Sequence, residues 1–160
     1  MRESLFRGKR LDNGEWVSSG NLITFNDEGE GKQFFIPQMN AKCTCTHDEQ
    51  DNIISFDSGM FYKVDPDTVG QFTGLTDKNG KKIFEGDIVR ILGDQSSADW
   101  RNVDYVALIA FIDGGFCALD GTIEDHGFRR YALARMDFDL EIIGNIHDNP
   151  ELLGGEEDED

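Results

Sequence analysis

Short apolar runs separated by turn residues make up most of the chain, and this pattern predicts a mainly β protein. Turn signals recur at about the 8–12-residue spacing typical of β-sandwiches and barrels. No segment sustains a 3.6-residue period, so long helices are not expected. The predicted strands are Phe6–Leu11, Trp16–Phe25, Gly31–Pro37, Ile53–Phe56, Met60–Val64, Ile83–Phe84, Ile88–Leu92, Val103–Ile112, Phe116–Leu119, Tyr131–Leu133 and Leu140–Ile143.

Pairs of turn residues predict how neighbouring strands connect. Asn13 and Gly14 are the residue types that take positive φ in a two-residue hairpin turn. Asn79-Gly80 predicts a tight hairpin turn, and Asp113-Gly114-Gly115 predicts the turn after the run Val103–Ile112. A single helical turn is predicted at Asn149–Leu153, with Asn149 as N-cap and Pro150 at the first helical position.

The length of 160 residues fits one domain of ordinary size. We expect a single β domain over residues 1–153, with an inserted or appended β lobe around residues 26–66. The end of the chain, residues 154–160, contains glycine and acidic residues and no apolar residue. Such a segment cannot bury enough apolar surface to fold, so we predict a disordered acidic tail that can be removed without loss of stability.

The acidic charge of the chain narrows the classes of partner. Asp and Glu number 32 against 15 Lys and Arg, which gives a net charge of −17. Binding to a phosphate backbone requires Lys and Arg that replace counterions, and anionic membranes attract basic segments. We therefore expect no direct nucleic-acid binding and no membrane docking.

Several features indicate the reducing cytoplasm as the location. Met1–Ser4 leads into an alternating polar pattern rather than the apolar core of a signal peptide. No apolar run approaches the length of a membrane span. The cysteine count is three, and only Cys43 and Cys45 are close together, which does not suit a secreted disulfide framework.

The glycine-rich stretch Thr68–Val89 is the densest concentration of turn residues. It lacks the spacing of a P-loop or dinucleotide fingerprint, and the spaced acidic ligands of an EF-hand are absent. A structural interpretation is better. Gly74 and Gly86 permit bends or close backbone approach, and Asp77 is placed to accept hydrogen bonds from backbone N–H groups that follow it.

A metal site is conceivable at Cys43, Cys45 and His47, because period two on a strand places all three side chains on one face. Thiolates and imidazoles are suitable zinc ligands, but a structural site needs a fourth. Cys117, His126 or a second subunit would have to supply it. The alternative is a polar, half-exposed strand that leads into an acidic loop. We predict no stoichiometric zinc.

The remaining polar residues do not assemble a recognisable catalytic constellation. A Cys117–His126 pair has nothing in the sequence to fix its geometry, and His147 suits a corner better than a proton shuttle. Carboxylate pairs such as Asp137 and Asp139 are common in so acidic a chain. We predict no catalytic residues, no bound cofactor and no metal ligands, and hence a protein that is not an enzyme.

Basic residues form small clusters, but these are too few to outweigh the acidic body of the chain. We expect them to pair with neighbouring carboxylates, within the chain or across a subunit contact. The clusters are Arg2, Arg7, Lys9 and Arg10 near the start, and Arg129 and Arg130.

Three motifs in order carry a resemblance to a known family. They are the "FRGKRLDNGEWVSSGNL" opening, "VGQFTGLTDKNGKKIFEGDIV" and "EIIGNIHDNPELL". Together they resemble the YopX family of phage and prophage proteins, over nearly the whole chain except the acidic tail. The resemblance implies an intracellular protein of a phage or prophage, and a mainly β fold with a small SH3-like barrel around Gly86–Val89. It implies no activity and no catalytic residues.

Three functional hypotheses follow. The leading one is a non-catalytic binding or assembly module with a host or phage protein partner. The second is an acidic mimic of DNA that inhibits a nucleic-acid-binding protein, and the third is an enzyme with an unrecognised site. Carboxylates at phosphate-like spacing would favour the second, and a deep pocket with convergent polar groups and perturbed pKa values would favour the third.

The longest apolar run, Val103–Ile112, predicts self-association. On a strand, one face carries Val103, Tyr105, Ala107, Ile109 and Phe111, and the other carries Val106, Leu108, Ala110 and Ile112. Both faces are apolar and both need a cover. A small barrel covers only the inner face. We therefore expect a homo-oligomer, unless a second layer comes from the same chain.

Overall fold

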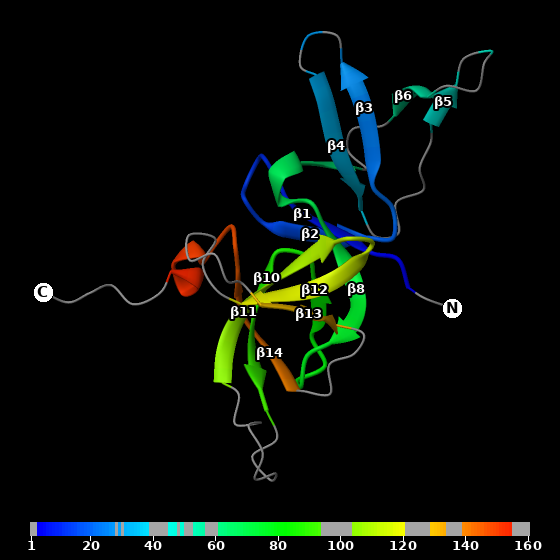
Figure 1. Ribbon diagram of the computed structural model, residues 1–160. Helices are drawn as coiled ribbons and strands as arrows, with labels where there is room; N and C mark the ends of the chain where they lie inside the picture. Colours follow the sequence, from blue (N-terminus) through cyan, green and yellow to red (C-terminus); the bar gives the residue numbers. More distant parts are fainter. Residues whose placement is uncertain are drawn as a thin grey trace, which may run out of the picture. The chain divides into compact units, whose positions relative to one another are not determined.

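The computed structural model describes residues 3–27, 29, 31–38, 45–47, 49, 53–56, 61–93, 104–120, 129–133 and 139–154. The chain divides into two compact units, Met1–Gln71 (unit 1) and Phe72–Asp160 (unit 2). The described residues include two complete 3-10 turns, η2 (Pro66–Thr68) and η5 (Pro150–Leu153), and contain no α-helix. The predicted mainly β class is therefore confirmed (Figure 1). Whether the chain folds as one domain with a disordered tail stays a prediction, and residues 155–160 lie outside the described residues.

The strands of unit 1 are β1 (Phe6–Lys9), β2 (Trp16–Ser19), β3 (Ile23–Asp27), β4 (Gly31–Pro37), β5 (Cys45–His47), β6 (Ile53–Phe56) and β7 (Phe61–Val64). The remaining strands lie in unit 2, except that the first of them begins in unit 1. They are β8 (Gly70–Thr76), β9 (Lys82–Phe84), β10 (Asp87–Leu92), β11 (Asp104–Ile112), β12 (Gly115–Asp120), β13 (Arg129–Ala132) and β14 (Asp139–Asn145). β8 crosses the boundary: Gly70 and Gln71 pair with β1, and Phe72 and Thr76 pair with β9.

Unit 1 is built from a three-stranded antiparallel sheet in the order β3-β4-β7 and from the β1–β2 hairpin. β3 and β4 form a long hairpin (Figure 1), with Phe25 and Phe35 in an edge-to-face contact at 5.7 Å between centroids. β4 ends at Pro37, as predicted, because proline cannot donate to a ladder. The buried side chains Ile36 and Val64 form the core of this unit.

Two predictions for the first hairpins are wrong in detail. The turn near Asn13 is not a two-residue turn: Arg10 N–H donates to the Glu15 carbonyl at 2.9 Å, so the connection covers Leu11–Gly14. Gly14 takes φ 73°, but Asp113 is the only described non-glycine residue with positive φ. The Asn13 side chain instead accepts from Glu15 N–H. The predicted strand Trp16–Phe25 is broken into β2 and β3 around Gly20.

Gly8 in β1 lies tightly against the core of unit 1. A Cβ added there would lie 3.0 Å from Val64 Cβ and Cγ2, and 3.3 Å from Ile36 Cδ1. Both neighbours sit on paired strands and have little room to move. Gly8→Ala should therefore destabilise the protein by about 1–2 kcal/mol through overpacking. Urea unfolding would measure the effect.

Gly20→Ala is the matched control for this substitution. Its Cβ would meet only the Ser4 carbonyl oxygen, at an ordinary 3.6 Å. Alanine there should be neutral or slightly stabilising, since it reduces the entropy of the unfolded chain. Equal stability of the Gly8→Ala and Gly20→Ala proteins would contradict close packing at Gly8.

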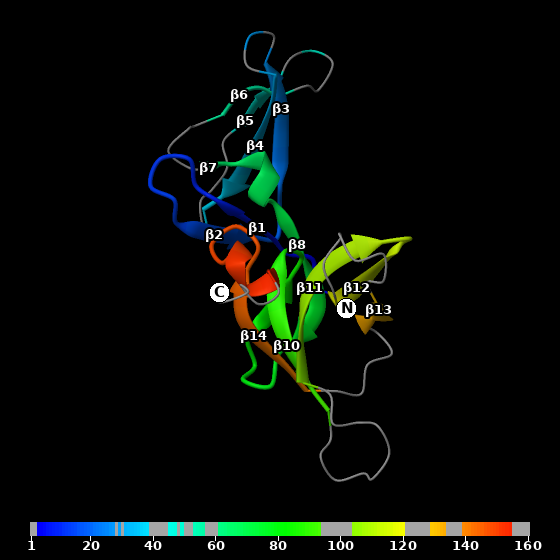
Figure 2. The same cartoon turned by 60° about the vertical axis from the view of Figure 1, so that its left-hand side comes forward.

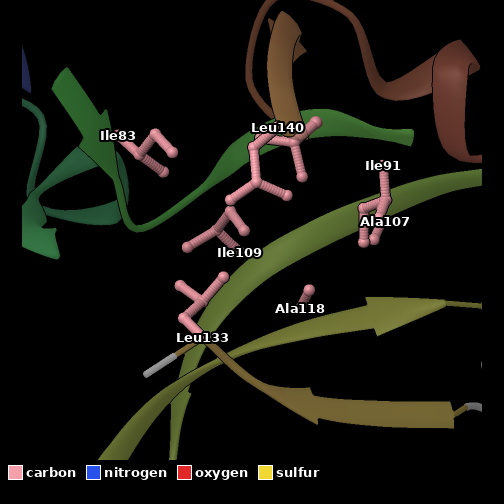
Figure 3. Close-up of a cluster of buried hydrophobic side chains, with 8 residues drawn as sticks. Ile83, Ile91, Ala107, Ile109, Ala118, Leu133 and Leu140 are labelled. Atoms are coloured by element: carbon pink, nitrogen blue, oxygen red, sulfur yellow. The ribbon is translucent and has the colours of Figure 1, made fainter. Parts of the chain in front are cut away.

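Unit 2 contains a five-stranded antiparallel sheet in the order β13-β12-β11-β10-β14. The sheet curls strongly, as the course of β11 in Figure 2 shows. Its inner face buries an apolar cluster with Ile109 near the centre (Figure 3). The cluster consists of Ile83, Val89, Ile91, Ala107, Ile109, Ala118, Leu133 and Leu140. A curled sheet that closes over one core fits the predicted barrel or sandwich class.

The second face of β11 is also apolar, as predicted, and it is covered in part. Val106, Leu108, Ala110 and Ile112 are half-buried. η5 contacts β11 and lies close to the end of β14 (Figure 2), where a Cβ on Gly144 would lie 2.9 Å from Leu152 Cδ1. The chain thus contributes a cover of its own, and self-association stays a prediction.

η5 itself agrees with the expected helical turn at Asn149–Leu153. Asn149 occupies the N-cap position and Pro150 follows it. The cap differs from the prediction in one respect, since the Asn149 side chain makes no capping hydrogen bond. Its Oδ1 lies instead against the backbone of Gly144.

Candidate binding site

An open hollow of about 550 Å³ lies in unit 1, and we call it the Arg10–Tyr62 hollow. It is lined by Arg10, Leu11, Asp12, Gln38, Phe61, Tyr62 and Lys63. The chain brings these residues together because the end of β1 continues beside β7. Arg10 forms an antiparallel bridge with Val64, and Leu11 N–H donates to the Lys63 carbonyl at 3.0 Å. This volume is within the range of small-ligand and peptide side-chain pockets.

Arg10 is held on three sides. Its guanidinium carbon lies 4.1 Å from the centre of the Tyr62 ring, a cation–π arrangement. Its Nε donates to Asp12 Oδ1 at 2.8 Å, and a second guanidinium nitrogen donates to Asp12 Oδ2. The Glu15 carboxylate lies 3.7 Å from Nη1. Arginine suits such a site because its planar fork matches a carboxylate and its face stacks on an aromatic ring.

The Arg10–Asp12 pair keeps both groups ionised. The hydrogen bond from Arg10 is the main reason that the pKa of the Asp12 carboxyl lies below its ordinary value. The same bond raises the pKa of Arg10. The charges of Arg10 and Asp12 are thus fixed over the whole neutral range.

The apolar part of the hollow consists of one buried and two accessible side chains. Phe61 is buried, Tyr62 is half-buried, and Leu11 on the rim is 56% exposed. An exposed leucine beside an aromatic surface, ringed by charged groups, is the composition of protein contact sites, which have an apolar centre and a polar rim.

Sequence reasoning did not predict this site, since it named no binding residues. It expected the basic residues near the start of the chain to pair with neighbouring carboxylates, and Arg10 does so with Asp12 and Glu15. Arg7 lies over the Trp16 ring, at 4.8 Å from the centroid. Tyr62 and Leu11 were not singled out, because no local pattern signals that β7 will lie beside the end of β1.

The glycine-rich stretch has the structural role that was predicted for it. Asp77 Oδ1 accepts from the backbone N–H groups of Asn79, at 2.9 Å, and Lys81, at 2.8 Å. Asp77 Oδ2 accepts from Ile142 N–H of β14 at 3.3 Å. Gly80 takes φ 79° and Gly86 takes φ 82°, and glycine is favoured at such positive φ values because it has no Cβ. The turn is therefore closed on itself and fastened to β14.

Burial and hydrogen bonding oppose each other at the Asp77 carboxyl. Burial raises its pKa, whereas the N–H donors of Lys81, Ile142 and Asn79 lower it, and the net pKa lies below the ordinary value. A second buried carboxyl, Asp87, accepts from Phe84 N–H at 2.7 Å. Both carboxylates accept from backbone N–H groups, Asp87 within the β9–β10 turn and Asp77 within its own turn and from β14.

The other polar residues of interest are separated. Cys117 is buried in β12, with Sγ 3.9 Å from the Gly115 carbonyl oxygen. His147 is exposed in the turn after β14, and its backbone N–H donates to Asn145 Oδ1 at 3.0 Å. It therefore occupies the corner that was predicted. Asp139 begins β14, and its suggested partner Asp137 lies outside the described residues, as does His126.

The suggested metal ligands cannot be placed together. Cys43 lies outside the described residues. The backbone of Cys45–His47 forms strand β5, which pairs with β6. Within the described ranges, no group of three His, Cys, Asp or Glu side chains is placed to hold a metal ion. The absence of zinc stays a prediction.

None of the helices in the described residues has the length and apolar character needed to cross a bilayer.

Comparison with known proteins identifies the family. The YopX protein family matches residues 5–154, nearly the whole chain, so the chain belongs to this family. The resemblance inferred from the three motifs is confirmed. A solved structure, protein EF1440 from Enterococcus faecalis, is similar at 27% identity and a TM-score of 0.47, covering 94% of this chain and 98% of that one. No curated protein matches the chain.

Proposed function

We propose that this YopX-family protein is a non-catalytic binding module of a phage or prophage, which acts in the cytoplasm of the bacterial host. Its contact site is the Arg10–Tyr62 hollow. The observation that carries the proposal is the exposed Leu11 on the rim of a preformed hollow whose charged groups are already fixed by Arg10. A preformed contact surface binds without the cost of ordering its side chains.

The hydrogen bonding of the buried carboxylates supports a binding role over a catalytic one. Asp77 and Asp87 accept from backbone N–H groups, and the pKa of Asp77 is lowered. A general acid or base works best with a pKa near neutrality, which for a carboxyl requires a shift in the opposite direction. The hydrogen bonds of these two groups are those of structural residues.

Affinity capture from a lysate of phage-infected bacteria tests the proposal, with wild-type protein and Leu11→Asp as baits. Leu11 is more than half exposed, so the change should leave the fold intact while it places a charge in the apolar part of the contact. We expect a host or phage protein to be retained by the wild type and reduced by about tenfold with Leu11→Asp, equivalent to about 1.4 kcal/mol.

The matched control is Leu75→Asp, which makes the same change at another exposed leucine, in β8. This variant should retain the partner as well as the wild type does. Equal retention by all three baits, or a loss of similar size in both variants, would contradict the hollow as the contact site.

A further inference from the structure

We propose that the Arg10–Tyr62 hollow binds a basic–apolar segment of a protein partner, in which an apolar side chain lies next to a lysine or arginine. This inference rests on the proposed function and names the chemistry of the ligand. The apolar side chain would pack on Leu11 and Tyr62, and the cation would pair with the Asp12 and Glu15 carboxylates.

The positive charge of Arg10 is already occupied. One face of the guanidinium lies on Tyr62, two of its nitrogens donate to Asp12, and the side chain is only 19% exposed. An incoming carboxylate would have to displace Asp12 from a bidentate pair, which is the strong form of this interaction. Arg10 therefore organises the site and is a poor anchor for an anion.

The two carboxylates beside Arg10 are accessible to a ligand. The side chain of Asp12 is 64% exposed and that of Glu15 is 72% exposed. The Asp12 carboxylate accepts backbone hydrogen bonds in addition to those from Arg10, and Glu15 Oε2 accepts from Asn13 Nδ2 at 2.9 Å. Glu15 keeps acceptor positions for a cation, since an ionised carboxylate offers about four. The charged lining residues are Arg10, Lys63 and Asp12, and Glu15 lies beside the hollow against Arg10. The four formal charges balance when Glu15 is included, and a cation would meet the exposed Asp12 and Glu15 side chains beside the half-buried Arg10.

The charge of the whole chain reinforces this preference. At −17, the chain attracts cations and repels anions over distances of about a Debye length. Unit 1 itself contains 12 acidic and seven basic residues. A basic segment is thus favoured both by the local carboxylates and by the surrounding field.

Two acetylated dipeptide amides test the preference directly, one leucyl-arginine and one leucyl-glutamate. Each would be titrated into the full-length isotope-labelled protein at low salt, with backbone amide signals of Leu11, Asp12, Tyr62 and Lys63 as the readout. We expect the arginine peptide to shift these signals with millimolar affinity, and the glutamate peptide to bind at least about fivefold more weakly. Added salt should reduce the difference.

The double variant Asp12→Asn, Glu15→Gln removes both carboxylates at nearly constant shape. In this variant, the ratio of the affinity for the arginine peptide to the affinity for the glutamate peptide should fall to about one or below. The control pair Asp139→Asn, Glu151→Gln removes two exposed charges from unit 2 and should keep the preference. Loss of the preference in both pairs would show that the overall field alone sets it and would overturn the assignment to Asp12 and Glu15.

The outcomes separate this inference from the proposed function. Stronger binding of the glutamate peptide at the hollow would overturn the basic preference and leave the hollow as a binding site. Absence of shifts with both peptides, or shifts confined to other residues, would overturn both.

Discussion

Replacing Asp77 by alanine should lower the free energy of unfolding by about 3 kcal/mol. The carboxylate is buried and accepts three backbone N–H groups, those of Asn79, Lys81 and Ile142. A buried donor that loses its acceptor costs about 1–3 kcal/mol. Asn79 and Lys81 are exposed, so water compensates part of this loss. Ile142 N–H, on a strand that packs against the core, is less accessible.

Asparagine at position 77 separates the hydrogen bonds from the charge. Asp77→Asn keeps one acceptor oxygen and should cost about half as much as alanine, because charge-assisted bonds are roughly twice as strong as neutral ones. Asp139→Ala, at an exposed position in β14, should change stability by less than about 0.5 kcal/mol. Urea unfolding of the three variants would measure these differences. Similar stability of Asp77→Ala and Asp139→Ala would show that the turn is held by other contacts.

The lowered pKa of Asp77 sets the pH range of its contribution. The stabilisation is complete above the pKa of an unfolded aspartate, about 3.9, and is lost as the pH falls through the lower folded-state value. The wild type should therefore lose its advantage over Asp77→Asn in acid. An advantage that grows below pH 4 would mean that the folded-state pKa is raised.

Ile109→Ala should cost about 3–4 kcal/mol, since it removes a fully buried branched side chain from the core of unit 2. Ile109 lies in β11, and its neighbours in the cluster come from β9, β10, β12 and β14 (Figure 3). Paired strands on both sides of β11 limit how far the cavity can collapse. Chemical denaturation monitored by circular dichroism would measure the loss.

Ile143→Ala provides the comparison for this core substitution. Ile143 is 37% exposed in β14 and should lose less than about 1 kcal/mol. A cost at Ile109 no larger than the cost at Ile143 would contradict the cluster as the core of this unit.

The strands were predictable where a run of apolar residues meets a turn of defined chemistry. The predicted Ile53–Phe56 is β6, and Asp113-Gly114 gives a turn with both residues at positive φ, 51° and 81°. The prediction for the Asn13-Gly14 connection was wrong because Asn13 does not take a positive φ. Its side chain accepts a hydrogen bond from Glu15 N–H. Local composition allowed both conformations, and the Arg10–Glu15 pairing determined which one formed.

The hollow was largely hidden from sequence reasoning because it depends on strand register. Tyr62 faces Arg10 only because Arg10 bridges Val64 and Leu11 bonds to Lys63. A slip of one residue would send alternate side chains to the opposite face of the sheet. The Arg10–Asp12 pair, in contrast, is local and could be anticipated from residues two positions apart.

β8 has a bearing on how this protein can evolve. A peptide break between Gln71 and Phe72 would deprive β1 of one neighbour and β9 of its partner, because both pair with the same strand. A chain that ends at Gln71 or begins at Phe72 would leave unpaired strand edges, and such edges promote aggregation. The halves of the gene should consequently be inherited together, and exchange between relatives should be tolerated better in the loops than at the middle of the chain.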